Sequence, residues 1–419
     1  MLFVSDSEVT PVFGGDDLFD LLGMESLVAH FQPILSLKSH SVVGYEGLVR
    51  GVRSDATGMV PPSTIFETAR KKGRLIQLDR LCRTVILDGY REIQQEGTDT
   101  LLFLNFESSL LNSVAPGNGH LLEQVAKRGI NPSNIVIEIV ESHVRRTANL
   151  IDFVDFYRSK GFLIALDDVG AGYSNFDRIV AIRPDILKVD RSIVKDLEKD
   201  YYKQEVFKSL GNLARKTGTL ILAEGIETEE EALCAMGLNA DLAQGYLFAR
   251  PQLHDPKIDG QARQAVSRLK DSFSHRKIRE IGRAKERHGL YDAAVRHILE
   301  ELVDRTDRDF NEVLRELVGR SSCVEALYIL DDRGIQRTDT VLRGPSTTRN
   351  RIFHSAKRGD DLSLKEYFYL PVSLGLPKYT TESYISLATG NLCRTIAVPF
   401  TGPDERLYVL CVDVAEPGG

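Results

Sequence analysis

Short apolar runs alternate with longer amphipathic stretches between about residues 25 and 255. The runs are rich in Val, Ile and Leu, and they are LLFLNFE (101–107), NIVIEIVE (134–141), FLIALDDV (162–169), DILKVD (185–190), LILAEGIE (220–227) and QGYLFARP (244–251). Apolar strands that alternate with helical patterns are typical of parallel strands covered by helices. Six or more such units favour an α/β fold with a closed (β/α)8-type, TIM-like barrel over a small open sheet.

Two of the amphipathic stretches carry clear signals of a helix end. The stretch QEVFKSLGNLARKTG has Gly218 just after its last turn, which is typical of a helix C-terminus. The stretch TEEEALCAMG opens with Thr228 and has Glu231 three positions later, which predicts a capping box. Both signals support helices between the apolar runs.

The pattern changes twice after the barrel region. Residues 257–310 have a helical pattern with frequent basic residues, which we interpret as a connecting helix or helix pair with a solvated face. From about residue 320 the chain becomes β-rich, with a turn at Asp332–Gly334 and further strands in RTIAVPF and RLYVLCVDV. We therefore predict an N-terminal segment (1–24), a barrel domain (25–256), a helical connector (257–310) and a small α+β domain (311–419).

Composition limits the kind of ligand and the compartment. The chain has 53 basic and 60 acidic residues, a net charge of −7, which does not favour binding to a nucleic-acid polymer. A small anionic ligand would need local positive groups or metal ions. The five cysteines are widely spaced without a CxxC pair, as expected for reduced thiols in a cytoplasmic protein. The chain has no signal-peptide pattern at its start and no apolar stretch of about 18 residues, so no membrane span is expected.

Acidic, amide and lysine side chains close the apolar runs of the predicted barrel. They are Glu46, Asn105, Glu138, Glu141, Asp167, Asp168, Lys188, Asp190, Glu224 and Glu227. Barrel active sites form where the strands end, so we expect these side chains to converge. Carboxylates that converge repel each other unless cations neutralise them, and oxygen ligands without His or Cys suit Mg²⁺ or Mn²⁺. A pair of such ions is one arrangement used for displacement at phosphorus.

Each of these residues also has an ordinary structural explanation. A single Glu at a strand end is more often a cap or a surface ion pair, and Lys188 alone fits a salt bridge. Asp167 and Asp168 fit an N-cap with a solvated neighbour. Their joint occurrence at the ends of six runs favours the functional interpretation, because burying unpaired polar groups is costly.

These blocks together resemble the EAL family of cyclic di-GMP phosphodiesterases over about residues 25–255. The opening FQPILSLKSHSVVGYEGLVRG (31–51) is similar to the family's signature region, with Glu46, Gly47 and Leu48 at the EAL triplet. The blocks that follow in the family's order are Asn105, the ExxE pair Glu138 and Glu141, DDVGAGYSN (167–175), PDILKVD (184–190), AEGIET (223–228) and QGYLFARP.

The resemblance implies a role for each matched residue. Two Mg²⁺ or Mn²⁺ ions, which inhibitory Ca²⁺ would replace, would be held by Glu46, Asn105, Glu138, Asp167 and Asp168. Lys188 and Glu224 would position or activate the attacking water, and which of them is the base stays open. Glu141 would anchor the loop 167–175. Substrate contacts would come from Gln32, Leu48, Arg50, Asp190, Glu227 and Gln244.

The resemblance also implies a bacterial signalling protein that forms a homodimer and releases linear pGpG. Departures from the family pattern leave a second interpretation open. Gly47 replaces Ala, and in the loop Val169 and Ala171 replace Phe and Thr. A weaker supporting shell lowers metal affinity or activity. We therefore keep two hypotheses: a phosphodiesterase, and a catalytically weak or silent receptor that signals cyclic di-GMP occupancy to a partner.

The C-terminal domain is similar to PAS-like and Cache-type sensor domains in two segments, GDDLSLKEYF (359–368) and YISLATGNLCRTIAVPF (384–400). This likeness implies a regulatory pocket for an unknown small ligand or protein partner. Polar candidates for such a pocket are Arg351, Tyr367, Tyr384 and Arg394. A plain packing or dimerisation module fits this segment nearly as well.

Overall fold

The computed structural model describes residues 24–53, 58–95, 100–107, 119–140, 147–171, 176–345 and 355–416. The chain divides into two compact units, Met1–His275 and Arg276–Gly419, and each is described by itself. Apart from Met24, the predicted N-terminal segment lies outside the described residues.

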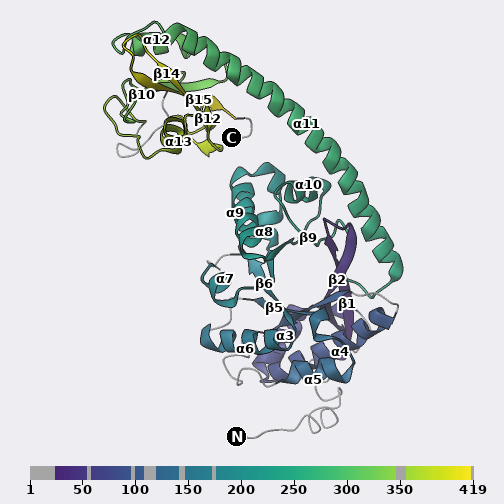
Figure 1. The fold of residues 1–419 in the computed structure, drawn as a ribbon. Helices are drawn as coiled ribbons and strands as arrows, with labels where there is room; N and C mark the ends of the chain where they lie inside the picture. The colour runs from purple at the N-terminus through teal and green to yellow at the C-terminus, as the bar shows by residue number, and fades with distance from the viewer. Residues whose placement is uncertain are drawn as a thin grey trace. The chain divides into compact units, whose positions relative to one another are not determined.

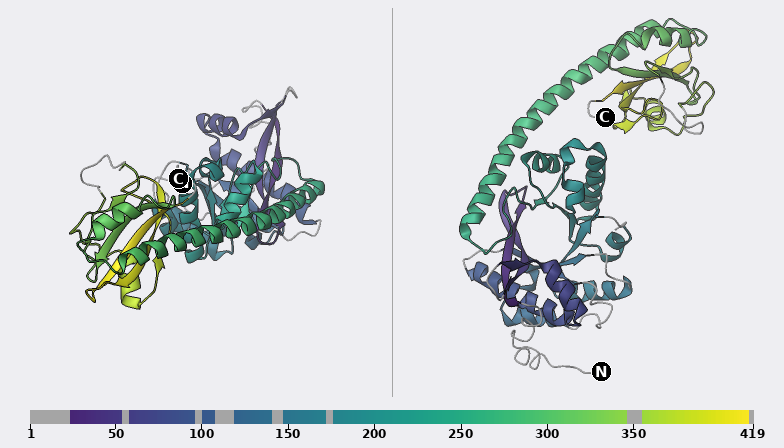
Figure 2. Two further views of the ribbon diagram at one scale, coloured as in Figure 1. Left: turned by 90° about the horizontal axis from the view of Figure 1, so that it is seen from above. Right: turned by 180° about the vertical axis from the view of Figure 1, so that it is seen from behind.

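The first unit contains a closed barrel. Its ring of strands closes because β1 pairs with both β2 and β9 (Figures 1 and 2). The strands are β1 (Met24–Ser36), β2 (Ser41–Arg53), β4 (Leu101–Phe106), β5 (Ile135–Val140), β6 (Leu163–Val169), β7 (Ile186–Val189), β8 (Leu220–Ala223) and β9 (Leu242–Ala243). A short strand β3 (Met59–Val60) pairs with β2 outside the ring. The predicted barrel is therefore confirmed, although β1 runs antiparallel to both of its neighbours.

Helices surround this ring on its outer side, as Figures 1 and 2 show. They are α3 (Pro62–Lys71), α4 (Leu75–Gln95), α5 (His120–Lys127), α6 (Thr147–Ser159), α7 (Phe176–Ile182), α8 (Arg191–Val194), α9 (Tyr201–Thr217) and α10 (Glu229–Gly237). Both predicted helix ends are confirmed: Gly218 is left-handed after α9, and Thr228 and Glu231 form the capping box of α10. No helix in the described ranges has the length and apolar character needed to cross a bilayer.

The last predicted strand of the barrel was placed wrongly. The run QGYLFARP (244–251) was expected to form it, but β9 ends at Ala243, and residues 244–251 form turns and irregular backbone. The cause is a close backbone crossing at Gly245, where a Cβ atom would lie 2.0 Å from the carbonyl oxygen of Ile226. Only glycine fits there, and the chain leaves the sheet at this point.

A single helix follows the barrel. Most of the predicted connector (257–310) is one continuous helix, α11 (Pro256–Leu302), which has 47 residues. Its early residues Ala262, Val266 and Leu269 are buried in the core of the first unit. Its late residues, among them Tyr291 and Leu302, are buried in the core of the second unit. One helix thus contributes side chains to two separate hydrophobic cores.

The second unit is an α+β domain built on one antiparallel sheet. The strand order is β11-β10-β15-β14-β12, and β13 also pairs with β14. One face packs against the end of α11 and α12 (Phe310–Leu317), and the other packs against α13 (Glu366–Leu374). The strands are β10 (Val324–Asp331), β11 (Val341–Leu342), β12 (Tyr379–Thr380), β13 (Tyr384–Ile385), β14 (Leu392–Thr401) and β15 (Leu407–Ala415). The predicted strands of this domain are confirmed, whereas its likeness to PAS or Cache domains stays a prediction.

Candidate active site

The interior of the barrel consists of an apolar layer followed by a polar layer. The apolar layer is made by Ile34, Phe103, Val136, Ala165, Ile186, Leu222 and Leu242. Two residues further toward the carboxyl end of each parallel strand, or two residues earlier on the reversed β1, the chain carries a polar side chain. Positions two apart on a strand face the same side, so these residues point inward as well. The residues at these positions are Gln32, Asn105, Glu138, Asp167, Lys188, Glu224 and Gln244, and Glu46 of β2, which follows Gly44, completes this polar layer.

Lys188 lies among three carboxylates of the polar layer. Its Nζ is 2.5 Å from Oε1 of Glu138, 2.7 Å from Oε1 of Glu224 and 3.1 Å from Oδ1 of Asp167. Lys188 is 1% exposed and Glu138 is fully buried. Water therefore does little to screen these charges, and the ion pairs are strong but costly to assemble.

The burial of these groups shifts their protonation. Burial opposes the charge of Lys188, but the carboxylates of Asp167, Glu138 and Glu224 outweigh it and hold the pKa of the ammonium well above its usual range. Burial raises the pKa of Glu138 well above that of a free carboxyl group, against the attraction of Lys188. It also raises the pKa of Glu224 to about 8, helped by the charges of Asp167 and Glu46. The polar layer therefore contains more carboxyl groups than the single ammonium of Lys188 can neutralise.

Amide side chains fix the position of Glu46 on the other side of the layer. Asn105 Nδ2 donates to Oε1 of Glu46 at 2.9 Å, and Gln244 Nε2 donates to Oε2 at 2.6 Å. The same Gln244 nitrogen donates to Gln32 Oε1 at 3.0 Å, and Gln32 in turn donates to the carbonyl of Ala249. Two amide groups thus hold the Glu46 carboxylate directly and a third acts through Gln244, which leaves Glu46 little freedom.

Asp167, Asp168 and Glu224 form the cluster with the spacing of a metal site. One ligand oxygen from each lies within 4.8 Å of the others. Asp168 has a left-handed backbone with φ of +56°, and its N–H donates to Oδ1 of Asp167 at 3.0 Å. Burial, followed by the charges of Asp167 and Asp190, raises the pKa of Asp168.

The residues of this site fit divalent cations. Glu46, Glu138, Asp167, Asp168 and Glu224 supply five carboxylates against the one ammonium of Lys188. Within the part of the chain that the structure describes, Oε2 of Glu138 is buried and has no hydrogen-bond partner. All of these donors are oxygen atoms, which suit Mg²⁺ or Mn²⁺ rather than zinc.

Two cavities open beside the polar layer. The first, of about 320 Å³, is lined by charged and amide groups including Glu46, Asp167, Asp168, Lys188, Glu224, Glu227, Gln32 and Gln244. The second, of about 350 Å³, shares Glu46 with the first and adds Asn105, Leu48, Phe66 and the buried pair Asp79 and Arg83. Most of the residues predicted from the sequence therefore line one of two neighbouring cavities.

Other predicted site residues lie elsewhere. Arg50 donates to the carbonyl of Val49 at 2.8 Å, and Asp190 caps α8 by accepting from the N–H of Ser192. Neither residue lines either cavity, so their contact with a substrate stays a prediction. Glu141 and residues 172–175 of the predicted loop lie outside the described residues.

Sequence reasoning missed two residues of the first cavity. Arg191 pairs with Glu227 at 2.7 Å, and Tyr246 is exposed with the Arg250 guanidinium 4.2 Å above its ring centre. Arg191 directly follows the block PDILKVD (184–190), whereas Tyr246 lies inside the block QGYLFARP (244–251), in which only Gln244 was given a role. Neither residue has a sequence signal of its own beyond its place in or beside a block.

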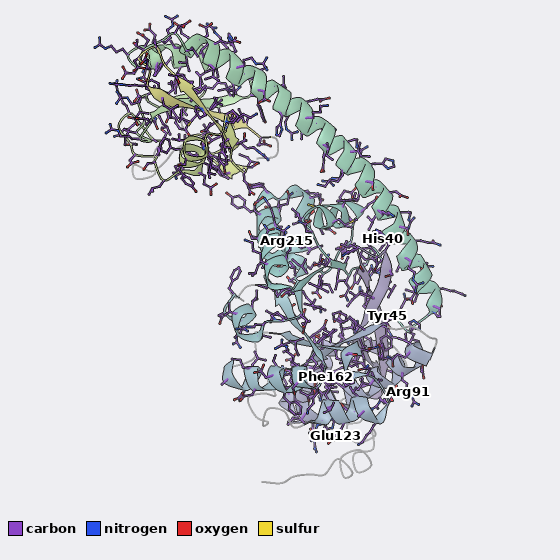
Figure 3. The ribbon with its side chains drawn as sticks, in the orientation of Figure 1. His40, Tyr45, Arg91, Glu123, Phe162 and Arg215 are labelled. Atoms are coloured by element: carbon purple, nitrogen blue, oxygen red, sulfur yellow. The ribbon has the colours of Figure 1, made fainter. Side chains whose placement is uncertain are left out.

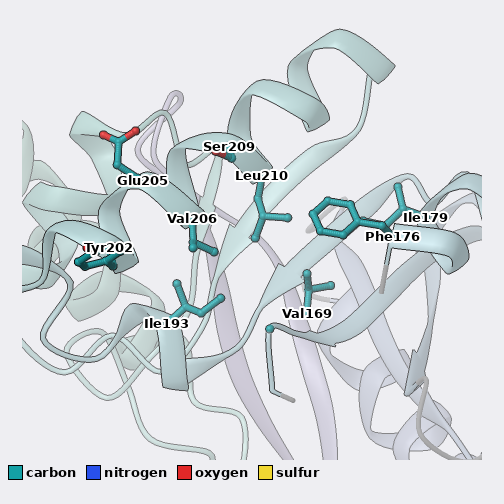
Figure 4. Close-up of a pocket in the computed structure, with 10 residues that line it drawn as sticks. Val169, Phe176, Ile179, Ile193, Tyr202, Glu205, Val206, Ser209 and Leu210 are labelled. Atoms are coloured by element: carbon teal, nitrogen blue, oxygen red, sulfur yellow. The ribbon is translucent and has the colours of Figure 1, made fainter. Parts of the chain in front are cut away.

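The described part of the 167–175 loop borders an apolar cavity of about 370 Å³. Val169 lies at one side of it, facing Phe176 and Ile179 of α7, Ile193 of α8 and Leu210 of α9 (Figure 4). Val169 is 3% exposed, and Phe176 is 59% exposed. The small side chain at position 169 leaves open space beside the strand that carries Asp167.

The polar candidates of the C-terminal domain divide into two groups. Tyr384 OH lies 2.6 Å from Thr395 Oγ1, and Tyr367 packs edge-on against Tyr328 at 6.2 Å. Arg394 instead pairs with Glu416 at 2.8 Å. Arg351 lies outside the described residues. No ligand role is assigned to any of these residues by the geometry.

Comparisons with known proteins place the barrel in a family. The EAL domain matches residues 16–251. The chain is 26% identical over 403 residues to the EAL-domain protein YkuI of Bacillus subtilis, covering 94% of this chain and 96% of YkuI. The solved structure of YkuI, which holds c-di-GMP and calcium, has a TM-score of 0.73 at 24% identity and covers 96% of this chain and 98% of YkuI. This likeness shows the fold of both units.

Relatives named for an activity match about half of the chain. The cyclic di-GMP phosphodiesterase RocR of Pseudomonas aeruginosa is 29% identical over 232 residues, covering 55% of this chain and 59% of RocR. A c-di-GMP complex of the MucR phosphodiesterase, from the same organism, has a TM-score of 0.50 at 25% identity and covers 54% of this chain and 92% of that one. With more than half of its length matched by the family, the chain belongs to the EAL domain family.

Proposed function

We propose that the barrel hydrolyses cyclic di-GMP to linear pGpG with the help of two divalent cations, Mg²⁺ or Mn²⁺. The observation that carries this proposal is the polar layer, where five carboxylates and one ammonium gather at the carboxyl ends of the strands. Such an excess of buried carboxylates favours the binding of cations. The names of RocR and MucR as cyclic di-GMP phosphodiesterases supply the substrate.

The proposed cation ligands are Glu46, Asn105, Glu138, Asp167 and Asp168. When bound, the cations polarise the phosphate and lower the pKa of a water molecule. The side chains of Gln32 and Gln244 orient Glu46 through the hydrogen bonds described above. Leu48 borders the second cavity, which has room for one base of the dinucleotide.

Glu224 is the proposed proton acceptor, and Lys188 is the proposed electrostatic partner. The pKa of the Lys188 ammonium is held well above its usual range, so it stays protonated and supplies positive charge beside the three carboxylates that it contacts. Burial raises the pKa of Glu224 to about 8, and the positive charge of bound cations would lower it and favour the carboxylate form that accepts a proton from water. Water attacks phosphorus, the P–O3′ bond breaks, and the leaving 3′ oxygen takes up a proton.

A receptor that binds cyclic di-GMP without efficient cleavage is the second candidate. The apolar cavity beside Val169 favours it, because the strand that carries Asp167 and Asp168 lacks an aromatic side chain to support it there. Loose support of metal ligands commonly lowers activity by about 10–100-fold. In this case the C-terminal unit would report occupancy to a partner.

Regulation belongs to the same proposal. The C-terminal unit would act as a sensor-like domain for a small ligand or a protein, and the chain would work as a homodimer. The division into a barrel domain (25–256), a connector (257–310) and a C-terminal domain (311–419) stays a prediction. The structural units divide between residues 275 and 276, inside α11.

An assay of product formation separates the two candidates. The full chain is incubated with cyclic di-GMP and Mg²⁺ or Mn²⁺, and pGpG is measured by chromatography. The phosphodiesterase hypothesis predicts that pGpG forms with Mg²⁺ or Mn²⁺ and does not form when Ca²⁺ replaces these ions. Ca²⁺ prefers more ligands and a looser geometry. Binding of the dinucleotide without any product would support the receptor, and absence of binding would overturn both candidates.

A further inference from the structure

The first turn of helix α11 contacts strand β2 of the barrel next to Glu46 of the polar layer. Tyr45 of β2 is 2% exposed, and its hydroxyl donates a hydrogen bond to Oδ2 of Asp259 in the first turn of α11. Figure 3 marks Tyr45 on the strand pair β1–β2. The two residues are 214 positions apart in the sequence, so this contact links the connector to the barrel wall.

The Tyr45–Asp259 contact is a strong and enclosed hydrogen bond. Asp259 is 8% exposed, and the ring of His254 stands edge-on to Tyr45 at 5.4 Å, with its Nε2 3.8 Å from Oδ2 of Asp259. Among the described residues, Oδ1 of Asp259 has no hydrogen-bond partner. A charged acceptor makes the bond stronger, and the N-terminal turn of a helix favours a negative side chain.

Tyr45 is adjacent to Glu46 on a tightly packed strand. The two side chains point to opposite faces of β2, so Glu46 enters the polar layer while Tyr45 faces α11. Glycines flank the pair: a Cβ at Gly44 would lie 2.6 Å from the carbonyl oxygen of Leu101, and one at Gly47 would lie 2.3 Å from Ile86. The backbone on either side of Tyr45 and Glu46 packs directly against Leu101 and Ile86. A shift of Tyr45 therefore moves Glu46 as well.

A second link runs from the connector to β1. The N–H of Phe31 donates to the carbonyl of Gln252 at 2.7 Å, and the N–H of Gln252 donates back at 3.2 Å. The next residue, Gln32, donates to the carbonyl of Ala249 and accepts from Gln244 in the polar layer. Gln252, just before α11, is therefore hydrogen-bonded to β1, and Asp259, in the first turn of α11, is hydrogen-bonded to β2.

We propose that Asp259 is a positioning residue for the cation site. Through its hydrogen bond to Tyr45, Asp259 fixes the position of the Glu46 carboxylate. The position of α11 on the barrel therefore determines the affinity of the site for divalent cations. This inference rests on the proposed function, because it concerns the same cations. The far end of α11 is buried in the core of the C-terminal unit. A ligand that shifts or turns this helix thereby alters the cation site of the barrel.

Binding of Mn²⁺ alone to the full-length chain tests this proposal. Titration calorimetry without nucleotide is run on wild type, Tyr45→Phe, Asp259→Ala, Asp259→Asn and the double variant Tyr45→Phe/Asp259→Ala. The control is Leu269→Ala, which removes a 3% exposed side chain from the same helix without touching Tyr45. Thermal unfolding is recorded for each variant, so that loss of stability and loss of affinity are separated.

The expected result is a roughly tenfold weaker affinity for Mn²⁺ in Tyr45→Phe and in Asp259→Ala. The double variant should lose no more than either single one, because both changes remove the same hydrogen bond. Asp259→Asn keeps an acceptor oxygen and should recover part of the affinity. Leu269→Ala should lower the unfolding temperature and leave Mn²⁺ affinity unchanged.

Wild-type Mn²⁺ affinity in both Tyr45→Phe and Asp259→Ala would overturn the inference and leave the contact as a structural anchor. An equal loss of affinity in Leu269→Ala would also overturn it, because general loosening would then explain the effect. A wild-type chain that binds no Mn²⁺ would instead defeat the proposed function itself. The two failures are therefore distinguishable.

Discussion

Buried acidic groups occur in both units of the chain, but their surroundings differ. In the C-terminal sheet, Asp413 is 5% exposed and accepts a hydrogen bond from Thr395 Oγ1 at 2.7 Å, with Tyr384 OH 3.5 Å away. In the barrel, Glu138 is fully buried and shares the single ammonium of Lys188 with Asp167 and Glu224.

The difference lies in how each carboxyl group can be neutralised. Asp413 accepts from hydroxyl groups, and burial, with a smaller effect of the Glu325 charge, raises its pKa to about 7, so one proton neutralises it. In the polar layer, burial raises the pKa of Glu138 and of Glu224 as well, but further carboxylates lie beside them around the one ammonium of Lys188. One proton is therefore enough for Asp413, whereas the several carboxylates of the polar layer form a site suited to cations.

The largest effect is expected when a carboxylate of the crowded site is removed. Glu46→Ala should reduce the rate of pGpG formation by at least about a thousandfold. This substitution removes a proposed cation ligand that Asn105 and Gln244 hold in place. Glu280→Ala, on the half-exposed part of α11, is the matched control and should retain full activity. Product formation by Glu46→Ala at the wild-type rate would show that Glu46 is not a cation ligand.

Replacing the shared ammonium tests whether Lys188 acts on the reaction or on binding. Lys188→Met should lower kcat by about a hundredfold and leave KM within a few-fold of the wild-type value. The Lys188 ammonium is expected to stabilise the negative charge that develops in the transition state, and this has little effect on substrate binding. Steady-state kinetics provide both values. Equal falls in kcat and in affinity would assign Lys188 to ligand binding alone.

The buried Asp413 of the C-terminal unit should respond to pH. The pKa of Asp413 is about 7 in the folded chain and about 3.9 in an unfolded one, so its stabilising contribution is present below pH 4 and disappears as pH rises through 7. Hydrogen exchange of β15 amides, corrected for intrinsic rates, should report an opening free energy that falls by roughly 2 kcal/mol between pH 5.5 and 8. Asp413→Asn should abolish this dependence, and an unchanged slope in this variant would place the titration elsewhere.

The smallest effect concerns the support of the crowded site. Val169→Phe together with Ala171→Thr should raise the rate of pGpG formation by about two- to tenfold, because the ring can enter the apolar cavity of about 370 Å³ beside the Asp167 strand. Ser209→Ala, at the edge of the same cavity, serves as a control that should leave the rate unchanged. An unaltered rate in the double variant would remove the loop from the account.

The barrel and most of its polar layer could be predicted from the sequence. Six of the inward-facing polar residues stand two positions after an apolar one, as with Phe103 and Asn105 or Ile186 and Lys188, and a strand's alternation makes that spacing informative. The reversed direction of β1 was missed, although only four residues, 37–40, separate it from β2. A parallel crossover needs a dozen or more residues, so the short connection already required an antiparallel pair.

Contacts between distant segments could not be predicted in this way. Tyr45 and Asp259 carry no motif that joins them, and only the folded chain brings the first turn of α11 against β2. The misplaced strand at QGYLFARP has a related cause, because the crossing of Gly245 over Ile226 depends on two separate loops. Local patterns specify elements, whereas such crossings depend on the assembled fold.

The central claim is that the crowded carboxylates hold divalent cations, and counting Mn²⁺ ions bound to the full-length chain tests it most directly. Equilibrium dialysis with cyclic di-GMP present should give two Mn²⁺ ions per chain for the wild type and a clear loss in Glu46→Ala. Wild-type protein that stays folded and binds no Mn²⁺ would contradict the account.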